Sequence, residues 1–178
     1  YGSEIHRMLH KVHEKAIEGE EVDSKWIADL IEDSFSARYA TKSIEENMKK
    51  AASKTLRRYI RQFPNLSKIT LDAEKEFEIM IGDSRISGAI DLLRKISEED
   101  GGEEDPVGVI DFKLYEEKEE LEERMETITD QLRIYALAAK DAFELDPREA
   151  KAYFLSDTSC EVMEVDVTEE SRSDVKRK

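Results

Sequence analysis

The sequence VIDFK at residues 109–113 places an acid and a base two positions apart inside an apolar run. Because side chains alternate between the two faces of a strand, Asp111 and Lys113 would point to the same side of it. A buried charge is costly unless a partner or a metal ion compensates it. The pair is therefore either an incidental feature of an edge strand or one half of an active site.

A second carboxylate, Asp91, lies in an earlier apolar stretch over residues 85–93. If this stretch pairs with residues 107–115 as the next strand, Asp91 reaches the same end of the sheet as Asp111. Carboxylate oxygens hold Mg²⁺ or Mn²⁺, and such an ion polarises a phosphoryl oxygen and makes water easier to deprotonate. A lysine beside that water stabilises the negative charge of the transition state. Taken alone, this pattern is weak, because many surface hairpins contain it.

The elements that must position these residues follow from the spacing of apolar side chains. Helical spacing predicts three helices, the second capped by Ser24, over residues 3–18, 24–36 and 43–62. The pattern then changes and predicts five strands, over residues 74–82, 85–93, 107–115, 150–156 and 161–167. The first alternates, and the third is apolar on both faces, as a central strand should be. A further helix over residues 127–143 separates the third strand from the fourth. This order predicts an α/β fold, with a central mixed β-sheet flanked by helices and an N-terminal helical segment.

The length of 178 residues suits a single domain with a substantial core. Within it we expect a helical part over residues 1–65, an α/β catalytic core over 66–168 and a frayed tail over 169–178. The chain opens without methionine and almost directly into a helix, so we expect it to be part of a longer protein. It lacks a run of about eighteen apolar residues, so we expect no membrane partner.

The net charge of −15 argues at first sight against a nucleic-acid partner. Its distribution matters more, because residues 38–62 carry eight basic side chains against two acidic ones. Acidic residues gather instead in two runs, 98–105 and 116–126. A solvated helix face explains the basic segment at least as well as a function does. If it holds a DNA backbone, the candidate residues are Lys50, Lys54, Arg57, Arg58 and Arg61.

The single cysteine, Cys160, excludes an internal disulfide and any four-cysteine zinc or iron–sulfur site formed by this chain alone. We therefore expect no iron–sulfur cluster. A reducing, cytoplasmic setting fits this use of cysteine best.

Five short motifs follow one another along the chain on the predicted elements: GSEIH (2–6), EKEF (74–77), SGAID (87–91), VIDFK (109–113) and QLRIY (131–135). Together they resemble the PD-(D/E)XK nuclease superfamily, and specifically its RecB-like branch. That branch includes the nuclease domains fused to UvrD-like and AddA-like helicases. The resemblance extends from Gly2 to about Leu155. It implies a metal-dependent DNA nuclease that works in DNA end processing or recombinational repair.

The resemblance also implies roles for individual residues. The ligands of one or two Mg²⁺ or Mn²⁺ ions would be His6, Asp91, Asp111 and the backbone carbonyl of Phe112. Lys113 would position the water that attacks the phosphodiester. His6 also suits an ordinary exposed helical histidine, since His10 and His13 on the same helix have no matching role.

Three further residues match supporting positions of the family. Glu74 would lie near the metal, although Glu76 and Glu78 share its face of the strand. Gln131 and Tyr135, one helical turn apart, match a Q-x-x-x-Y motif that the family places against the active site and the DNA. Their helical spacing with apolar neighbours also suits plain core packing.

The partners that the resemblance implies are DNA, as single strands or ends, and helicase domains of the same or a partner chain. Those domains would supply most of the DNA affinity, so we expect this chain alone to bind DNA weakly. The alternative is a nuclease-like module that binds DNA or protein without cutting. Degenerate members usually lose the Asp or the Lys of the signature, and the presence of both here favours the enzyme. An accidental match of five ordered motifs is the least favoured interpretation.

Overall fold

The computed structural model describes residues 1–37, 40–96, 106–114 and 118–175. The acidic loop expected at 98–105 lies outside these ranges. The helices are α1 (Gly2–Ile17), α2 (Ser24–Ser34), α3 (Lys42–Gln62), α4 (Leu66–Ile69), α5 (Lys118–Phe143) and α6 (Glu169–Val175). The strands are β1 (Thr70–Ile81), β2 (Ser84–Lys95), β3 (Pro106–Leu114), β4 (Asp146–Leu155) and β5 (Cys160–Val165).

The five strands form one sheet in the order β1-β2-β3-β4-β5, so β3 is the central strand. Strands β3 and β4 run parallel, and the other neighbouring pairs are antiparallel. The parallel pair needs a long crossover, which α5 supplies. This mixed sheet with flanking helices confirms the predicted α/β fold class.

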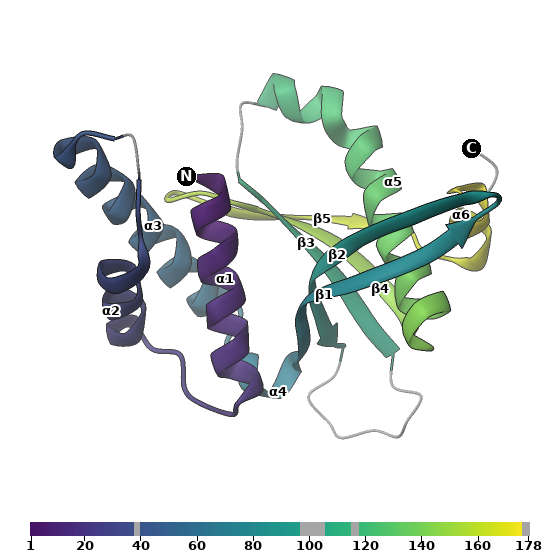
Figure 1. Ribbon diagram of the computed structural model, residues 1–178, viewed down its shortest axis with the longest axis horizontal. Coiled ribbons are helices and arrows are strands. Elements are labelled where there is room, and N and C mark those ends of the chain that lie inside the picture. Colours follow the sequence, from purple (N-terminus) through teal and green to yellow (C-terminus); the bar gives the residue numbers. More distant parts are fainter. Residues whose placement is uncertain (38–39, 97–105, 115–117, 176–178) are drawn as a thin grey trace.

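Two hydrophobic cores cover the two faces of the sheet. Ile110 and Phe112 on β3 pack with residues of α1, α2 and α3. Their neighbour Val109 points the other way and packs with α5 and with Phe154 on β4. Figure 1 shows α1 beside the sheet with α2 and α3 beyond it, and α5 on the other side. The alternation along β3 therefore places α1 and α5 on opposite sides of the strand that contains Asp111.

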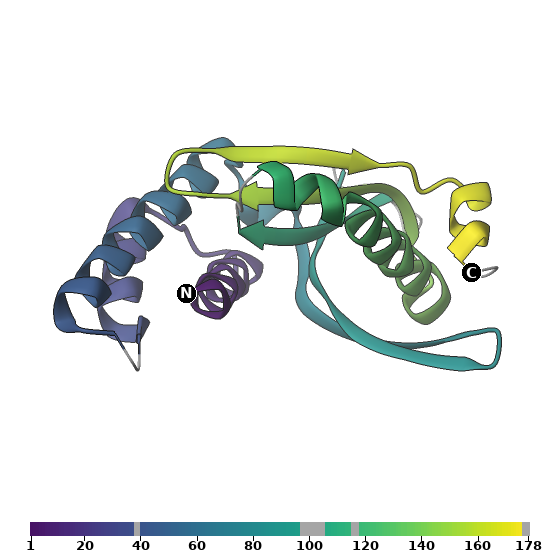
Figure 2. The ribbon, with the colours of Figure 1, turned by 90° about the horizontal axis from the view of Figure 1, so that it is seen from above.

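Strand β2 separates from β3 next to Asp91 and Asp111. The described β2–β3 register runs only from Leu92–Ile110 to Lys95–Val107. Beyond that, β2 stays paired with β1, and the hairpin curves away past α5 (Figure 2). Phe77 on β1 packs against Tyr135 of α5. The separation opens the sheet beside Asp111 instead of continuing the ladder.

The start of α2 differs from its predicted form. Asp23, with an extended backbone, caps the helix, and its carboxylate accepts a hydrogen bond from the N–H of Trp26 at 2.7 Å. The predicted Ser24 cap is wrong, because Ser24 is already the first helical residue. An N-cap residue lies just outside the helix, and Asp is among its preferred types.

The C-terminal segment also differs from expectation. Residues expected to form a frayed tail contain the helix α6, in which Ser171 and Arg172 are buried. Arg172 donates a hydrogen bond to the carbonyl oxygen of Pro147 at 3.3 Å, which ties α6 to the start of β4. Polar composition hid this docking, because the buried groups here are a hydroxyl and a guanidinium. No helix within the described parts of the chain has the length and the hydropathy needed to cross a membrane.

Candidate active site

Asp91 on β2 and Asp111 on β3 lie where the two strands separate. The N–H of Phe112 donates a hydrogen bond to Oδ2 of Asp91 at 2.7 Å. His6 approaches the same carboxylate from α1, with its Nδ1 3.6 Å from Oδ2. Where the β2–β3 ladder stops, the backbone N–H of Phe112 is therefore satisfied by the Asp91 side chain and not by a strand partner.

Asp111 begins a chain of polar contacts that joins β3 to α5. Its side chain is 2% exposed, and its Oδ2 lies 2.8 Å from Nζ of Lys113. Lys113 donates a hydrogen bond to Oε1 of Gln131 at 3.0 Å. Nε2 of Gln131 in turn donates to the hydroxyl of Tyr135 at 2.7 Å. The structure thus brings the signature strand and the Q-x-x-x-Y pair into direct contact.

Burial raises the pKa of the Asp91 carboxyl, and the nearby charge of Asp111 raises it further. Burial also raises the pKa of Asp111, against the opposing effect of the Lys113 ammonium. Burial first, and then the charge of Asp111, raise the pKa of Tyr135 to about 12, so its hydroxyl stays neutral near pH 7. Negative charge at this site is therefore poorly compensated by the protein alone.

The donor set fits a hard divalent cation. Two carboxylates that are buried close together gain from a cation between them, which favours their charged forms. Among the described residues, however, no three His, Cys, Asp or Glu side chains already converge as ligands. His6 contacts Asp91, while Asp111 contacts Lys113, so the predicted ligands lie as two adjacent pairs.

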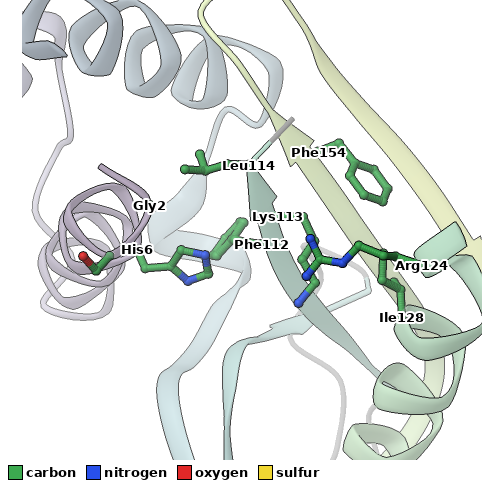
Figure 3. Close-up of a pocket in the computed structure, with 9 residues that line it drawn as sticks. Gly2, His6, Phe112, Lys113, Leu114, Arg124, Ile128 and Phe154 are labelled. Atoms are coloured by element: carbon green, nitrogen blue, oxygen red, sulfur yellow. The ribbon is translucent and has the colours of Figure 1, made fainter. Parts of the chain in front are cut away.

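A cavity of about 290 Å³ opens beside these pairs. Figure 3 shows His6 entering from α1 and Arg124 from α5, with Phe112 and Lys113 on β3 between them. Its lining residues are Gly2, Ser3, His6, Phe112, Lys113, Leu114, Arg124, Ile128 and Phe154. Arg124 was not predicted from sequence, although it stands one helical repeat of seven residues before Gln131 on the same face of α5.

The remaining residues of α1 and β1 have other neighbours. Glu74, which has a positive φ of 50°, lies with its Oε2 3.9 Å from Nε2 of His10. His13 is fully buried, with Nδ1 3.0 Å from Oγ1 of Thr70 and Nε2 2.9 Å from the hydroxyl of Tyr59. Glu74 therefore approaches His10, whose nearer carboxylate is that of Glu14 at 3.3 Å, and His13 holds α1 to the sheet and to α3.

The five basic candidates of α3 do not line the cavity that contains Lys113. Lys54 lies 3.8 Å from the carboxylate of Asp157, and Arg58 donates to the Asp157 carbonyl at 3.1 Å. Lys54 and Arg58 therefore face the turn between β4 and β5. A second, apolar hollow reaches α3 and shares Gly2 and Leu114 with the cavity, so the two regions adjoin.

Comparison with known proteins identifies the family of the chain. No curated protein matches the chain with significance. The family model of the PD-(D/E)XK nuclease superfamily matches residues 1–177, which is nearly the whole chain. The matched region covers every element that contributes to the site, from α1 to α5. The chain belongs to the PD-(D/E)XK nuclease superfamily.

Proposed function

We propose that this chain is a Mg²⁺- or Mn²⁺-dependent deoxyribonuclease of the RecB-like branch. The observation that carries the proposal is the chain of contacts from Asp111 through Lys113 and Gln131 to Tyr135, with Asp91 beside it. Residues from β2, β3 and α5 contribute to one small region, and their types are those that phosphodiester hydrolysis uses. Membership of a nuclease superfamily supports the same conclusion.

In this proposal each residue has a defined task. A divalent cation held by His6, Asp91, Asp111 and the Phe112 carbonyl would supply polarisation of a phosphoryl oxygen. Lys113 orients the attacking water and stabilises the negative charge that grows on the phosphate. Gln131 accepts a hydrogen bond from the Lys113 ammonium and so fixes its direction.

Three further contacts support the site. Tyr135 accepts a hydrogen bond from Gln131, and its neutral hydroxyl adds no charge beside the two aspartates. Phe112 donates its N–H to Asp91, which holds that carboxylate toward β3. Glu74 would act at longer range, through its contact with His10.

The proposed substrate is DNA presented as single strands or ends, during end processing or recombinational repair. Helicase domains of the same or a partner chain would deliver it in the cytoplasm. The net charge of −15 supports this division of work, because an acidic domain gains from motor domains that hold the strand.

A second candidate is a module that binds DNA or protein without cutting. The observation in its favour is that the predicted ligands lie as two pairs and not as a converged set within the described residues. The presence of Asp91, Asp111 and Lys113 together argues for the enzyme.

Incubation of the purified protein with labelled single-stranded DNA distinguishes the two candidates. The enzyme cuts the DNA in Mg²⁺ or Mn²⁺, and EDTA stops the cutting. Calorimetric titration with Mn²⁺ is the second measurement, and it detects a competent site even where cutting is slow. DNA that stays intact, together with no heat of Mn²⁺ binding, would contradict the enzyme and favour the non-cutting module.

A further inference from the structure

The cavity beside Lys113 has an unusual charge for this protein. The whole chain carries −15, yet the side chains that line the cavity include Lys113, Arg124 and His6 and no carboxylate among the residues described. Two cationic side chains, Lys113 of β3 and Arg124 of α5, therefore line the same cavity. Asp91 and Asp111 lie beside the cavity but do not line it, so the described groups that face the cavity are complementary to an anion.

One face of helix α5 is turned toward the cavity and Lys113. Arg124, Ile128, Gln131 and Tyr135 follow at intervals of four, three and four residues, which places them on one helical face. Ile128 lines the cavity, and Gln131 bonds Lys113. Arg124 is the outermost of the four residues, and Figure 3 shows it extending from α5 toward Lys113.

The two cations differ in their surroundings. Lys113 lies against the buried Asp111 and donates to Gln131, so its ammonium is fixed at the carboxylates. Arg124 is exposed, at the rim of the same cavity. A guanidinium presents several donors in one plane and matches two oxygens of a phosphate at once.

We propose that Arg124 is a substrate-binding residue that holds a phosphate of the DNA strand in this cavity, on the α5 side of Lys113. The identity of the ligand as DNA rests on the proposed function. Arg124 acts on the bound strand before and during cleavage alike, so it contributes to affinity and not to the chemical step. Lys113, in contrast, acts in the chemical step and contributes little to the affinity for DNA.

The test is binding of a short fluorescent single-stranded DNA, followed by anisotropy with Ca²⁺ in place of Mg²⁺. The variants are Arg124→Gln, Arg124→Lys and the control Arg133→Gln. Arg133 lies nine residues further along α5, two and a half turns away, and so on the opposite face. Thermal unfolding of each variant checks that the fold is retained.

We expect Arg124→Gln to weaken DNA binding roughly tenfold to a hundredfold, the effect of one hydrogen-bonded charge pair. The slope of log affinity against log salt should fall by about 0.7, the value for one phosphate contact on a single strand. Arg124→Lys should retain the slope, and Arg133→Gln should behave as wild type. In cleavage assays the KM rises while kcat stays nearly constant.

Equal binding by wild type and Arg124→Gln overturns the proposal, as does equal weakening in Arg124→Gln and Arg133→Gln. Failure of the wild type to bind the DNA at low salt overturns it too. These outcomes are distinct from failure of the proposed function. A wild type that binds DNA through Arg124 and never cuts would refute the nuclease and leave the phosphate site in place.

Discussion

The charged pair of VIDFK belongs to the centre of the sheet and not to an edge strand. Asp111 is 2% exposed on the middle strand β3, and Lys113 lies 2.8 Å from it. Because the Asp111 carboxylate is buried, it needs the Lys113 ammonium, which is itself partly exposed, to compensate its charge. The observed geometry therefore excludes the incidental surface pair that the sequence alone left open.

Lys113→Ala should lower kcat by about a hundredfold to a thousandfold, the usual cost of losing one group that stabilises transition-state charge. Mn²⁺ affinity should persist, because Asp91 and Asp111 remain. Single-turnover cleavage and Mn²⁺ calorimetry measure the two quantities. The control is Lys140→Ala, which removes a half-exposed ammonium near the other end of α5, where it pairs with Glu169. Unchanged cleavage by Lys113→Ala would contradict the role assigned to the lysine.

Gln131 and Tyr135 should act as one unit. Gln131→Ala and Tyr135→Phe each lose the 2.7 Å hydrogen bond between Nε2 and the hydroxyl, at a cost of about 1 kcal/mol in unfolding free energy. The double variant should lose less than the sum, because both substitutions remove the same bond. Urea unfolding of the four proteins gives the coupling. Strict additivity would show that the bond is absent in solution.

At the level of elements, apolar patterns predicted the hairpin, the central strand and the crossover helix, because the apolar side chains of these elements are buried. It also placed Asp91 next to Asp111 in the sheet. The Ser24 cap and the frayed tail were wrong, since local polar bonds decide them: Asp23 caps α2, and Ser171 and Arg172 dock α6. Arg124 was missed because it stands inside an acidic run, where a lone base resembles ordinary surface charge.

The buried His13 of α1 should make the stability of the protein depend on pH. Burial, and then the nearby charge of His10, lower the pKa of His13 to about 3, from 6.5 for the free side chain. The unfolded chain therefore binds more protons between these values. The contribution of His13 to stability is complete above pH 6.5 and is lost as the pH falls toward 3.

The free energy of unfolding should then decrease by up to about 1.4 kcal/mol per pH unit through His13. The His13→Gln variant lacks this titration, so its free energy of unfolding should depend less on pH between 6.5 and 4.5 than that of the wild type. At pH 7 the variant should be less stable than the wild type. Urea unfolding across this range, for both proteins, measures the difference. Parallel pH profiles would show that His13 is not buried as a neutral ring.

On the scale of the whole molecule, the proposed function sets the acidic character of the chain against the basic helix α3 in DNA binding. On α3, Lys50, Lys54, Arg57 and Arg61 follow at helical spacing, and Arg58 is engaged by the carbonyl of Asp157. These side chains do not line the cavity, but Lys54 lies 3.8 Å from Asp157, which lines the hollow that adjoins it. In the proposed function the basic side chains of α3 would contact a strand only beyond the cut site.

The isolated protein should bind DNA weakly and release it as salt rises. Combined substitution of Lys50, Lys54 and Arg61 by Gln should reduce the salt slope by about 0.7 for each phosphate that these side chains neutralise in the wild type. It should leave kcat unchanged. Anisotropy titrations at several salt concentrations test this. Tight binding that ignores salt would contradict the electrostatic account of the basic helix.

The most direct measurement is the rate of cleavage of labelled single-stranded DNA in Mn²⁺ by wild type and Asp111→Asn. The matched control is Asp83→Asn, which removes an exposed carboxylate at the turn of the β1–β2 hairpin. We predict metal-dependent cleavage by the wild type and the control, and none above background by Asp111→Asn. Equal cleavage by all three proteins, or no cleavage by a wild type that also binds no Mn²⁺ in calorimetry, would contradict the assignment of this site as a nuclease centre.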